Sequence, residues 1–258
     1  LKKAGEALAC RAMLRFHQGD LAGAHHDLMA LHRLGRLVAA SGTLVQWAAG
    51  MAMDQGAIEG DQALVTSGCL SRGQAVQYLE ALRKLPAFAD VRALIDVPER
   101  FCGLDTAMRV AMAHRSASLV SSMPDEAGAA GSERGEYRCV LDAVVDWDSA
   151  FREVNRHYDR SVAIAGMDDA AAREKARREF QRARSLRSQK MEQEVRPALR
   201  RKIRENRGDP AAVRSGMTEM MTVLVLSMSS YCGRARERSD ERAVAHDLTL
   251  VALALEIH

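Results

Sequence analysis

Apolar residues recur every three or four positions along most of this chain, and this period constrains the fold more than any other feature of its sequence. The segment 21–38 is the clearest example, with apolar or small residues at Leu21, Ala24, Leu28, Leu31, Gly35 and Val38. A period near 3.6 is typical of an α-helix that buries one face. Aromatic residues make up only 4% of the chain, while the helix formers Ala, Leu, Arg and Met are plentiful. The sequence therefore predicts an all-α protein.

Short steps of glycine and capping residues divide the expected helices. Gly19-Asp20 separates the first two, because glycine permits the turn and the Asp20 side chain caps the next helix. Thr43 and Ser71 are expected to cap later helices. A second Gly-Asp step, Gly60-Asp61, follows the first by 41 residues, which matches two helices per repeat of an α-solenoid. The last helix is expected to begin at about Glu241.

The first helix pair has the small and apolar residues of a known helical repeat. The matching positions are Ala12, Gly19-Asp20, Ala24, Leu28 and Leu31. Residues 8–38 thus resemble one degenerate tetratricopeptide unit. The positions that depart from that family are Arg11 and Arg15, where Leu and Tyr are usual, and Arg36, where the closing Pro belongs. The resemblance implies that helices in this part of the chain pack as pairs.

The character of the chain changes near its middle. Residues 118–135 are small, polar and rich in glycine and serine, as in a flexible linker or loop. We therefore expect a tetratricopeptide-like or α-solenoid-like region over residues 1–117, with repeat-like helix pairs. The linker would join it to an irregular helical bundle over residues 136–258, which contains a long basic helix.

Three longer stretches resemble a group of uncharacterised bacterial proteins of unassigned function. They are GDLAGAHHDLMALHRLGRLVA, DWDSAFREVNRHYDR and ERAVAHDLTLVALALEIH. Members of that group often have an amino-terminal membrane anchor. The chain begins at Leu1 without Met, so we expect a fragment or a processed product, and it has no run of about 18 apolar residues. The resemblance implies a membrane-anchored or cell-envelope location if an anchor precedes Leu1, and a cytoplasmic location otherwise.

The segment 146–160 combines more charged, polar and aromatic side chains that could form a site than any other part of the sequence. On a helix begun by Asp146, one face carries Asp148, Arg152, Asn155 and Asp159, beside an aromatic face of Trp147, Phe151 and Tyr158. Such a group could bind a polar ligand or a cation, with Tyr158 at its edge. The alternative, which we favour, is that the charged residues form ion pairs and cap the helix while the aromatic residues fill the core.

The segment 173–207 is strongly basic, with 14 Lys and Arg against 5 Glu. Its expected basic face consists of Arg177, Arg178, Arg184, Arg200 and Arg201. Such a face could bind nucleic acid or an anionic membrane. Base stacking would be nearly absent, because Phe180 is the only aromatic residue there. We favour the alternative of a solvated surface on a packed helix.

The histidines and cysteines do not have the spacing of metal sites. His25 and His26 are adjacent and His32 lies two helical turns after His25, so the three cannot share an ion. We expect these histidines at the boundary between core and surface. The five cysteines include no CxxC pair, and we expect each to be a small core residue.

The sequence contains no catalytic, metal-binding or phosphate-binding motif, so we predict no cofactor and no enzymatic activity. We expect a non-catalytic helical interaction or scaffold module that binds a protein or peptide partner. Binding of anionic membrane or nucleic acid through residues 173–207 is the first alternative. A hydrolase-like enzyme that uses Asp148, Asp159 and His157 is a more remote one, and it requires these three side chains to converge.

Overall fold

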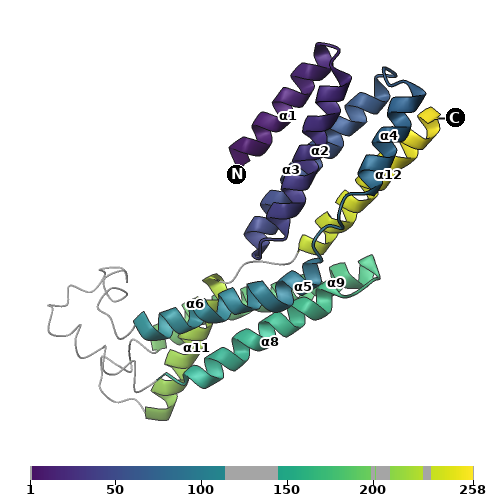
Figure 1. Cartoon of the computed structure of the whole chain (residues 1–258). Coiled ribbons are helices and arrows are strands. Elements are labelled where there is room, and N and C mark those ends of the chain that lie inside the picture. The colour runs from purple at the N-terminus through teal and green to yellow at the C-terminus, as the bar shows by residue number, and fades with distance from the viewer. Residues whose placement is uncertain (1, 114–144, 199–200, 202–209, 229–233, 258) are drawn as a thin grey trace. The chain divides into compact units, whose positions relative to one another are not determined.

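The structure is a computed structural model that describes residues 2–113, 145–198, 201, 210–228 and 234–257. All regular secondary structure within these ranges is helical (Figure 1), so the prediction of an all-α fold is confirmed. The expected linker, residues 118–135, lies outside the described residues. The repeat-like pairing of helices stays a prediction.

The chain divides into two compact units. Unit 1 consists of Leu1–Leu94 and Cys232–His258, and unit 2 consists of Ile95–Tyr231. The helices of unit 1 are α1 (Lys2–His17), α2 (Leu21–Ala39), α3 (Leu44–Thr66), α4 (Arg72–Arg83), α5 (Val91–Leu94) and α12 (Ala235–Ile257). Those of unit 2 are the π-helix η1 (Ile95–Glu99), α6 (Arg100–Ala113), α8 (Trp147–Ala165), α9 (Ala170–Lys190), the π-helix η3 (Met191–Val195) and α11 (Pro210–Met228). The boundaries of these units differ from the regions 1–117 and 136–258 expected from the sequence, because the last helix, α12, is part of the same unit as α1 to α5.

Local capping explains where the helices of unit 1 begin. Gly19 has a φ of +80°, and the Asp20 side chain accepts a hydrogen bond of 2.8 Å from the backbone N–H of Gly23. Thr43 and Ser71 each form a capping box with a glutamine three residues later. These three predicted helix starts are confirmed.

Two boundaries expected from the sequence are wrong. Gly60-Asp61 forms no turn, because α3 continues through it to Thr66. Gly60 instead gives Leu28 room, since a Cβ at position 60 would lie 2.5 Å from the Leu28 Cδ2. The last helix begins at Ala235 rather than at about Glu241.

The core of unit 1 is built by helices from both ends of the chain. Leu28 of α2, Tyr78 and Leu82 of α4 and Leu253 of α12 belong to one buried apolar cluster. In Figure 1 the yellow α12 lies beside α4. Helix α12 is therefore an integral part of unit 1, although more than 130 residues separate it from α5 along the chain.

A pair of glycines lets α2 and α3 approach at backbone distance. A Cβ at Gly35 would lie 2.7 Å from the carbonyl oxygen of Gly50. A Cβ at Gly50 would lie 2.5 Å from the amide nitrogen of Ala39, and closer still to the carbonyl oxygen of Gly35. Both distances are far below van der Waals contact, so only glycine fits at this crossing.

Unit 2 packs its helices around side chains of α8. Tyr158 is fully buried, and its ring lies against Gly103 of α6, where a Cβ would be 2.7 Å from the Tyr158 Cε2. Arg187 of α9 pairs with Glu219 of α11 at 2.6 Å and with Glu153 of α8 at 2.9 Å. This arginine thus connects three helices of the unit.

The cysteines are not core residues where the structure describes them. Cys10, Cys69 and Cys102 are exposed free thiols, contrary to the expectation from the sequence. Their apolar sequence neighbours do not determine their burial, because burial depends on which face of a segment packs against the rest of the unit. Cys139 and Cys232 lie outside the described residues.

Replacement of Gly50 by Ala tests the close crossing of α2 and α3. The added methyl would overlap backbone atoms of α2, so we expect Gly50→Ala to lower the free energy of unfolding by about 1–3 kcal/mol. Gly56→Ala is the matched control in the same helix, because a Cβ there meets no atom within 4 Å. The control should raise the free energy of unfolding by up to about 1 kcal/mol. Urea denaturation measures both, and equal effects of the two substitutions would contradict the crossing.

Candidate functional site

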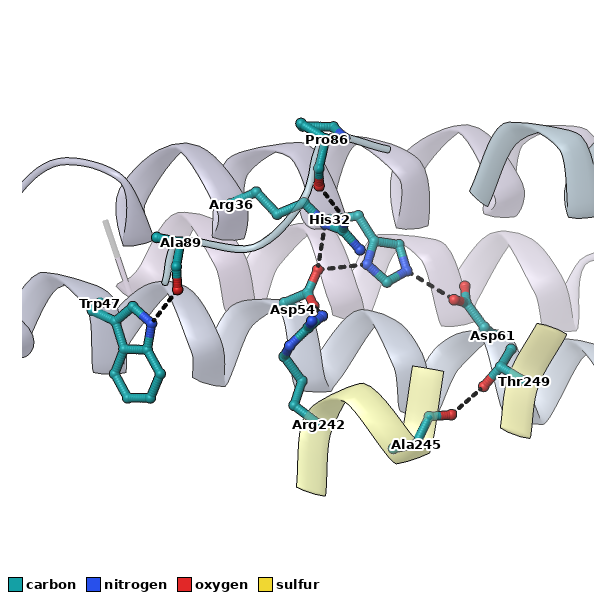
Figure 2. Close-up of polar contacts among 10 residues, drawn as sticks. All are labelled: His32, Arg36, Trp47, Asp54, Asp61, Pro86, Ala89, Arg242, Ala245 and Thr249. Atoms are coloured by element: carbon teal, nitrogen blue, oxygen red, sulfur yellow. Dashed lines mark hydrogen bonds and ion pairs between the residues drawn. The ribbon is translucent and has the colours of Figure 1, made fainter. Parts of the chain in front are cut away.

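A buried histidine of unit 1 is held between two carboxylates (Figure 2). The Nδ1 of His32 is 2.7 Å from the Oδ1 of Asp54, and its Nε2 is 2.8 Å from the Oδ2 of Asp61. All three side chains are fully buried. His32 belongs to α2, and both aspartates belong to α3.

The geometry fixes the charge of the His32 ring. Ionised carboxylates only accept hydrogen bonds, so both ring nitrogens donate and the imidazole is protonated. Burial alone would lower the pKa of His32, but the hydrogen bonds and negative charges of Asp54 and Asp61 outweigh it and raise this pKa to about 9. Burial would likewise raise the pKa of Asp54, but His32, Arg36 and Arg242 bring it down to about 2. The site is therefore ionic at neutral pH.

Two arginines and a tyrosine complete the buried polar network. The Arg36 Nε is 3.4 Å from the Oδ1 of Asp54, and the Arg242 Nη1 is 2.6 Å from its Oδ2. Tyr78 donates to Asp61, and burial together with this carboxylate raises the pKa of Tyr78. We call His32, Arg36, Asp54, Asp61, Tyr78 and Arg242 the His32 network. It contains three cations and two carboxylates, and it joins α2, α3, α4 and α12.

The segment after α4 closes over the network. Arg36 donates to the backbone carbonyl of Pro86, and the guanidinium of Arg242 lies 4.4 Å from the centre of the Phe88 ring. The Trp47 indole packs edge-on against Phe88 and donates to the carbonyl of Ala89 at 3.4 Å. Aromatic and backbone groups thus separate the charges from solvent.

Helical spacing and the glycine crossing explain the placement of these residues. Asp54 and Asp61 are seven residues apart on α3, and His32 and Arg36 are four apart on α2, so each pair shares a helix face. Gly35 lies one turn from His32, and Gly50 lies one turn from Asp54. The close approach of the two backbones brings the short aspartates within hydrogen-bond distance of the imidazole.

This arrangement suits structure better than catalysis. A base must accept a proton near neutral pH, whereas both nitrogens of His32 donate and its pKa is about 9. Full burial of Asp54 and Asp61 also separates them from any solution molecule. Within the described residues, no group of three or more His, Cys, Asp and Glu is arranged to hold a metal ion.

The expectation that the three histidines lie at the boundary of the core is wrong for His32. His26 is 78% exposed and His25 is partly buried, but His32 has no exposed surface. One sequence feature could have indicated that a buried cation such as His32 is needed. It is the pair Asp54 and Asp61, two turns apart in a helix that is otherwise largely apolar. Arg36, which departs from the tetratricopeptide pattern, was a second signal.

The structure brings only part of the predicted 146–160 group together. Asn155 and Asp159 both face Arg100 of α6, at 3.4 Å and 2.7 Å. Arg152 and Asp148 are exposed, and Tyr158 is in the core. Arg100 also bonds Asp96 at 2.8 Å, so these polar groups form an ion-pair cluster between helices.

The three residues of the remote hydrolase alternative do not converge. Asp148 and Asp159 are separated by about 16 Å along α8. His157 is buried and its ring lies 5.1 Å from that of Phe180. Burial and the positive charge of Arg184 lower the pKa of His157 to about 4, so this ring is neutral at pH 7.

Several arginines of the predicted basic face are occupied by contacts within unit 2. Arg177 is buried against Glu174, and Arg184 donates to the backbone carbonyl of Leu226 at 2.5 Å. Arg178 is exposed but pairs with the same Glu174, and Arg201 is exposed. Arg200 lies outside the described residues.

Comparison of the chain with models of protein families, with curated proteins and with solved structures finds no match. Among the helices that the structure describes, none combines the length and apolar character needed to cross a bilayer. The case for a function therefore depends on the geometry of the two units themselves.

The raised pKa of His32 predicts that unit 1 loses stability in mild alkali. The pKa of His32 is about 9 in the folded chain and 6.5 in the unfolded chain. The stability that its protonation contributes is therefore complete below pH 6.5 and is lost as the pH rises to about 9. We expect the free energy of unfolding of unit 1 to fall by roughly 2–3 kcal/mol between pH 7 and pH 9. The fluorescence of Trp47 in a Trp147→Phe background reports this unit during urea denaturation. The lowered pKa values of His25 and His246 act in the opposite sense, but only below pH 6.5.

Two variants control this pH experiment. His32→Gln should remove the decline between pH 7 and pH 9, whereas replacement of the exposed His26 by Gln should keep it. If His32→Gln retains the full decline, the imidazolium interpretation is wrong.

Proposed function

We propose that the protein is a non-catalytic helical interaction module, and that a partner protein binds along the outer face of α12. The observation that carries this proposal is a row of exposed apolar residues on that helix. They are Val244, Leu248, Val251 and Leu255, each with more than half of its surface exposed. We call these four residues the α12 seam.

The α12 seam lies opposite the buried face of the same helix. Arg242, Thr249 and Leu253 of α12 point into unit 1. At 100° per residue, Val244 and Leu253 lie on opposite sides of the helix, and Leu248 and Val251 are close to the side of Val244. A contiguous apolar row on the solvent side of a packed helix is typical of a protein-binding surface.

The His32 network supports the proposal, because it provides a rigid base for this surface. Arg242 ties the helix to Asp54 of α3, and Leu253 belongs to the same buried apolar cluster as Leu28. A binding surface on a fixed helix loses little conformational entropy when a partner docks. The placement of Arg177 and Arg184 in internal contacts gives less support to a module that binds nucleic acid or anionic membrane.

Photo-crosslinking from the α12 seam tests this proposal. A photoreactive residue at position 248 should give protein adducts in a native lysate, whereas one at Val45 should not give the same adducts. Val45 is the matched control, because it is 71% exposed and lies on α3 of the same unit. The double variant Leu248→Asp, Val251→Asp should reduce capture of the same partner at least about tenfold, since charge opposes burial of an apolar contact.

The free energy of unfolding of this double variant should stay within about 0.5 kcal/mol of the wild-type value, because both positions face solvent. Adducts that are identical at positions 248 and 45, or capture that survives the double substitution, would exclude the α12 seam as the binding surface.

A further inference from the structure

The spacing of the α12 seam is that of a helix–helix contact. Its four residues follow one another at intervals of four, three and four, which is the pattern that a straight helix presents to another helix. The seam extends for about 16 Å along the axis, or three helical turns. Partners that dock an amphipathic helix use anchors at this same spacing.

Small residues border the α12 seam and allow a partner backbone to approach. Ala245 and Ala252 lie on one side of it, and Ala254 lies on the other. All three are partly exposed, and Ala252 and Ala254 also pack against the buried apolar cluster of unit 1. A surface with branched apolar residues in the middle and alanines at the sides accommodates a second helix more readily than it accommodates a flat sheet.

The exposed charges of α12 between positions 241 and 257, the stretch that contains the α12 seam, have a single sign. Three charged side chains are exposed between positions 241 and 257 of α12, and all are acidic: Glu241, Asp247 and Glu256. Arg242, the one arginine in this stretch, points into the unit and pairs with Asp54. Within the part of the chain that the structure describes, none of the three acidic residues has an ion-pair partner. They are therefore free to pair with a binding partner.

This charge pattern discriminates between two occupants. A second copy of the chain, docked α12 against α12, would bring acidic residues close to acidic residues, and like charges across a contact oppose association. A helix with an apolar stripe bordered by Lys or Arg would instead place cations beside Glu241 and Asp247, which flank the α12 seam on its two sides. Given the function proposed above, we infer that the α12 seam binds a basic amphipathic helix of a partner protein.

Two designed peptides test this inference on the full chain. Both are helical and share one apolar stripe with the intervals of the α12 seam, but one has Lys and Arg at its flanking positions and the other has Glu. The basic peptide should bind at least about tenfold more tightly than the acidic one in fluorescence anisotropy at low salt. The preference should shrink as salt screens the charges.

Variants of the chain separate the apolar and the charged parts of the contact. The triple variant Glu241→Gln, Asp247→Asn, Glu256→Gln should lose the preference for the basic peptide. Replacement of the exposed Glu59 of α3 by Gln is the control and should keep it. Leu248→Asp, Val251→Asp should bind neither peptide.

The outcomes distinguish this inference from the function on which it rests. Equal binding of both peptides would overturn the inference that the partner is a basic helix, and so would no binding while crosslinking from position 248 persists. Either result leaves the proposed interaction module standing. A dimer in sedimentation experiments that is lost in Leu248→Asp, Val251→Asp makes a second copy the occupant and also overturns it. Absence of both peptide binding and specific crosslinks overturns the inference together with the proposed function.

Discussion

The fold of unit 1 depends on a protonated imidazole that is buried between two carboxylates. Removing such charges from water costs several kcal/mol for each ion, and only close pairing offsets this cost. His32, Asp54 and Asp61 achieve that pairing at 2.7–2.8 Å with no exposed surface. Any change that moves α2, α3 or α12 apart would leave a buried charge without its partner, so the network favours one arrangement of the helices over looser ones.

The same network connects the end of the chain to its beginning. Arg242 reaches Asp54 across 188 positions of sequence, and the contact fixes α12 on α3 and α4. Because Arg242 and Leu253 point inward, Val244, Leu248, Val251 and Leu255 point outward as a continuous apolar row. The proposed binding surface is thus a consequence of how the buried charges hold the helix.

Local features of the fold could be predicted from the sequence, whereas the network could not. Asp20, Thr43 and Ser71 begin helices because a cap involves only the next three residues. Gly60-Asp61 has the composition of a turn, yet Gly60 accommodates Leu28 and Asp61 binds His32. Which of these roles a glycine and an aspartate take depends on the neighbouring helix, and a local pattern does not contain that information. The partners of Asp54 could not be predicted either, because they come from two other helices: His32 and Arg36 from α2, and Arg242 from α12.

Hydrogen exchange of α12 tests the central claim most directly. In Arg242→Gln, the backbone amides of α12 should lose protection, while those of α2 and α3 should keep most of theirs through the remaining contacts of His32. Arg238→Gln is the matched control, since Arg238 is exposed on the same helix. On this claim, exchange in α12 should be at least about tenfold faster for Arg242→Gln than for Arg238→Gln, which corresponds to a loss of about 1.4 kcal/mol. Equal protection of α12 in the two variants would contradict it.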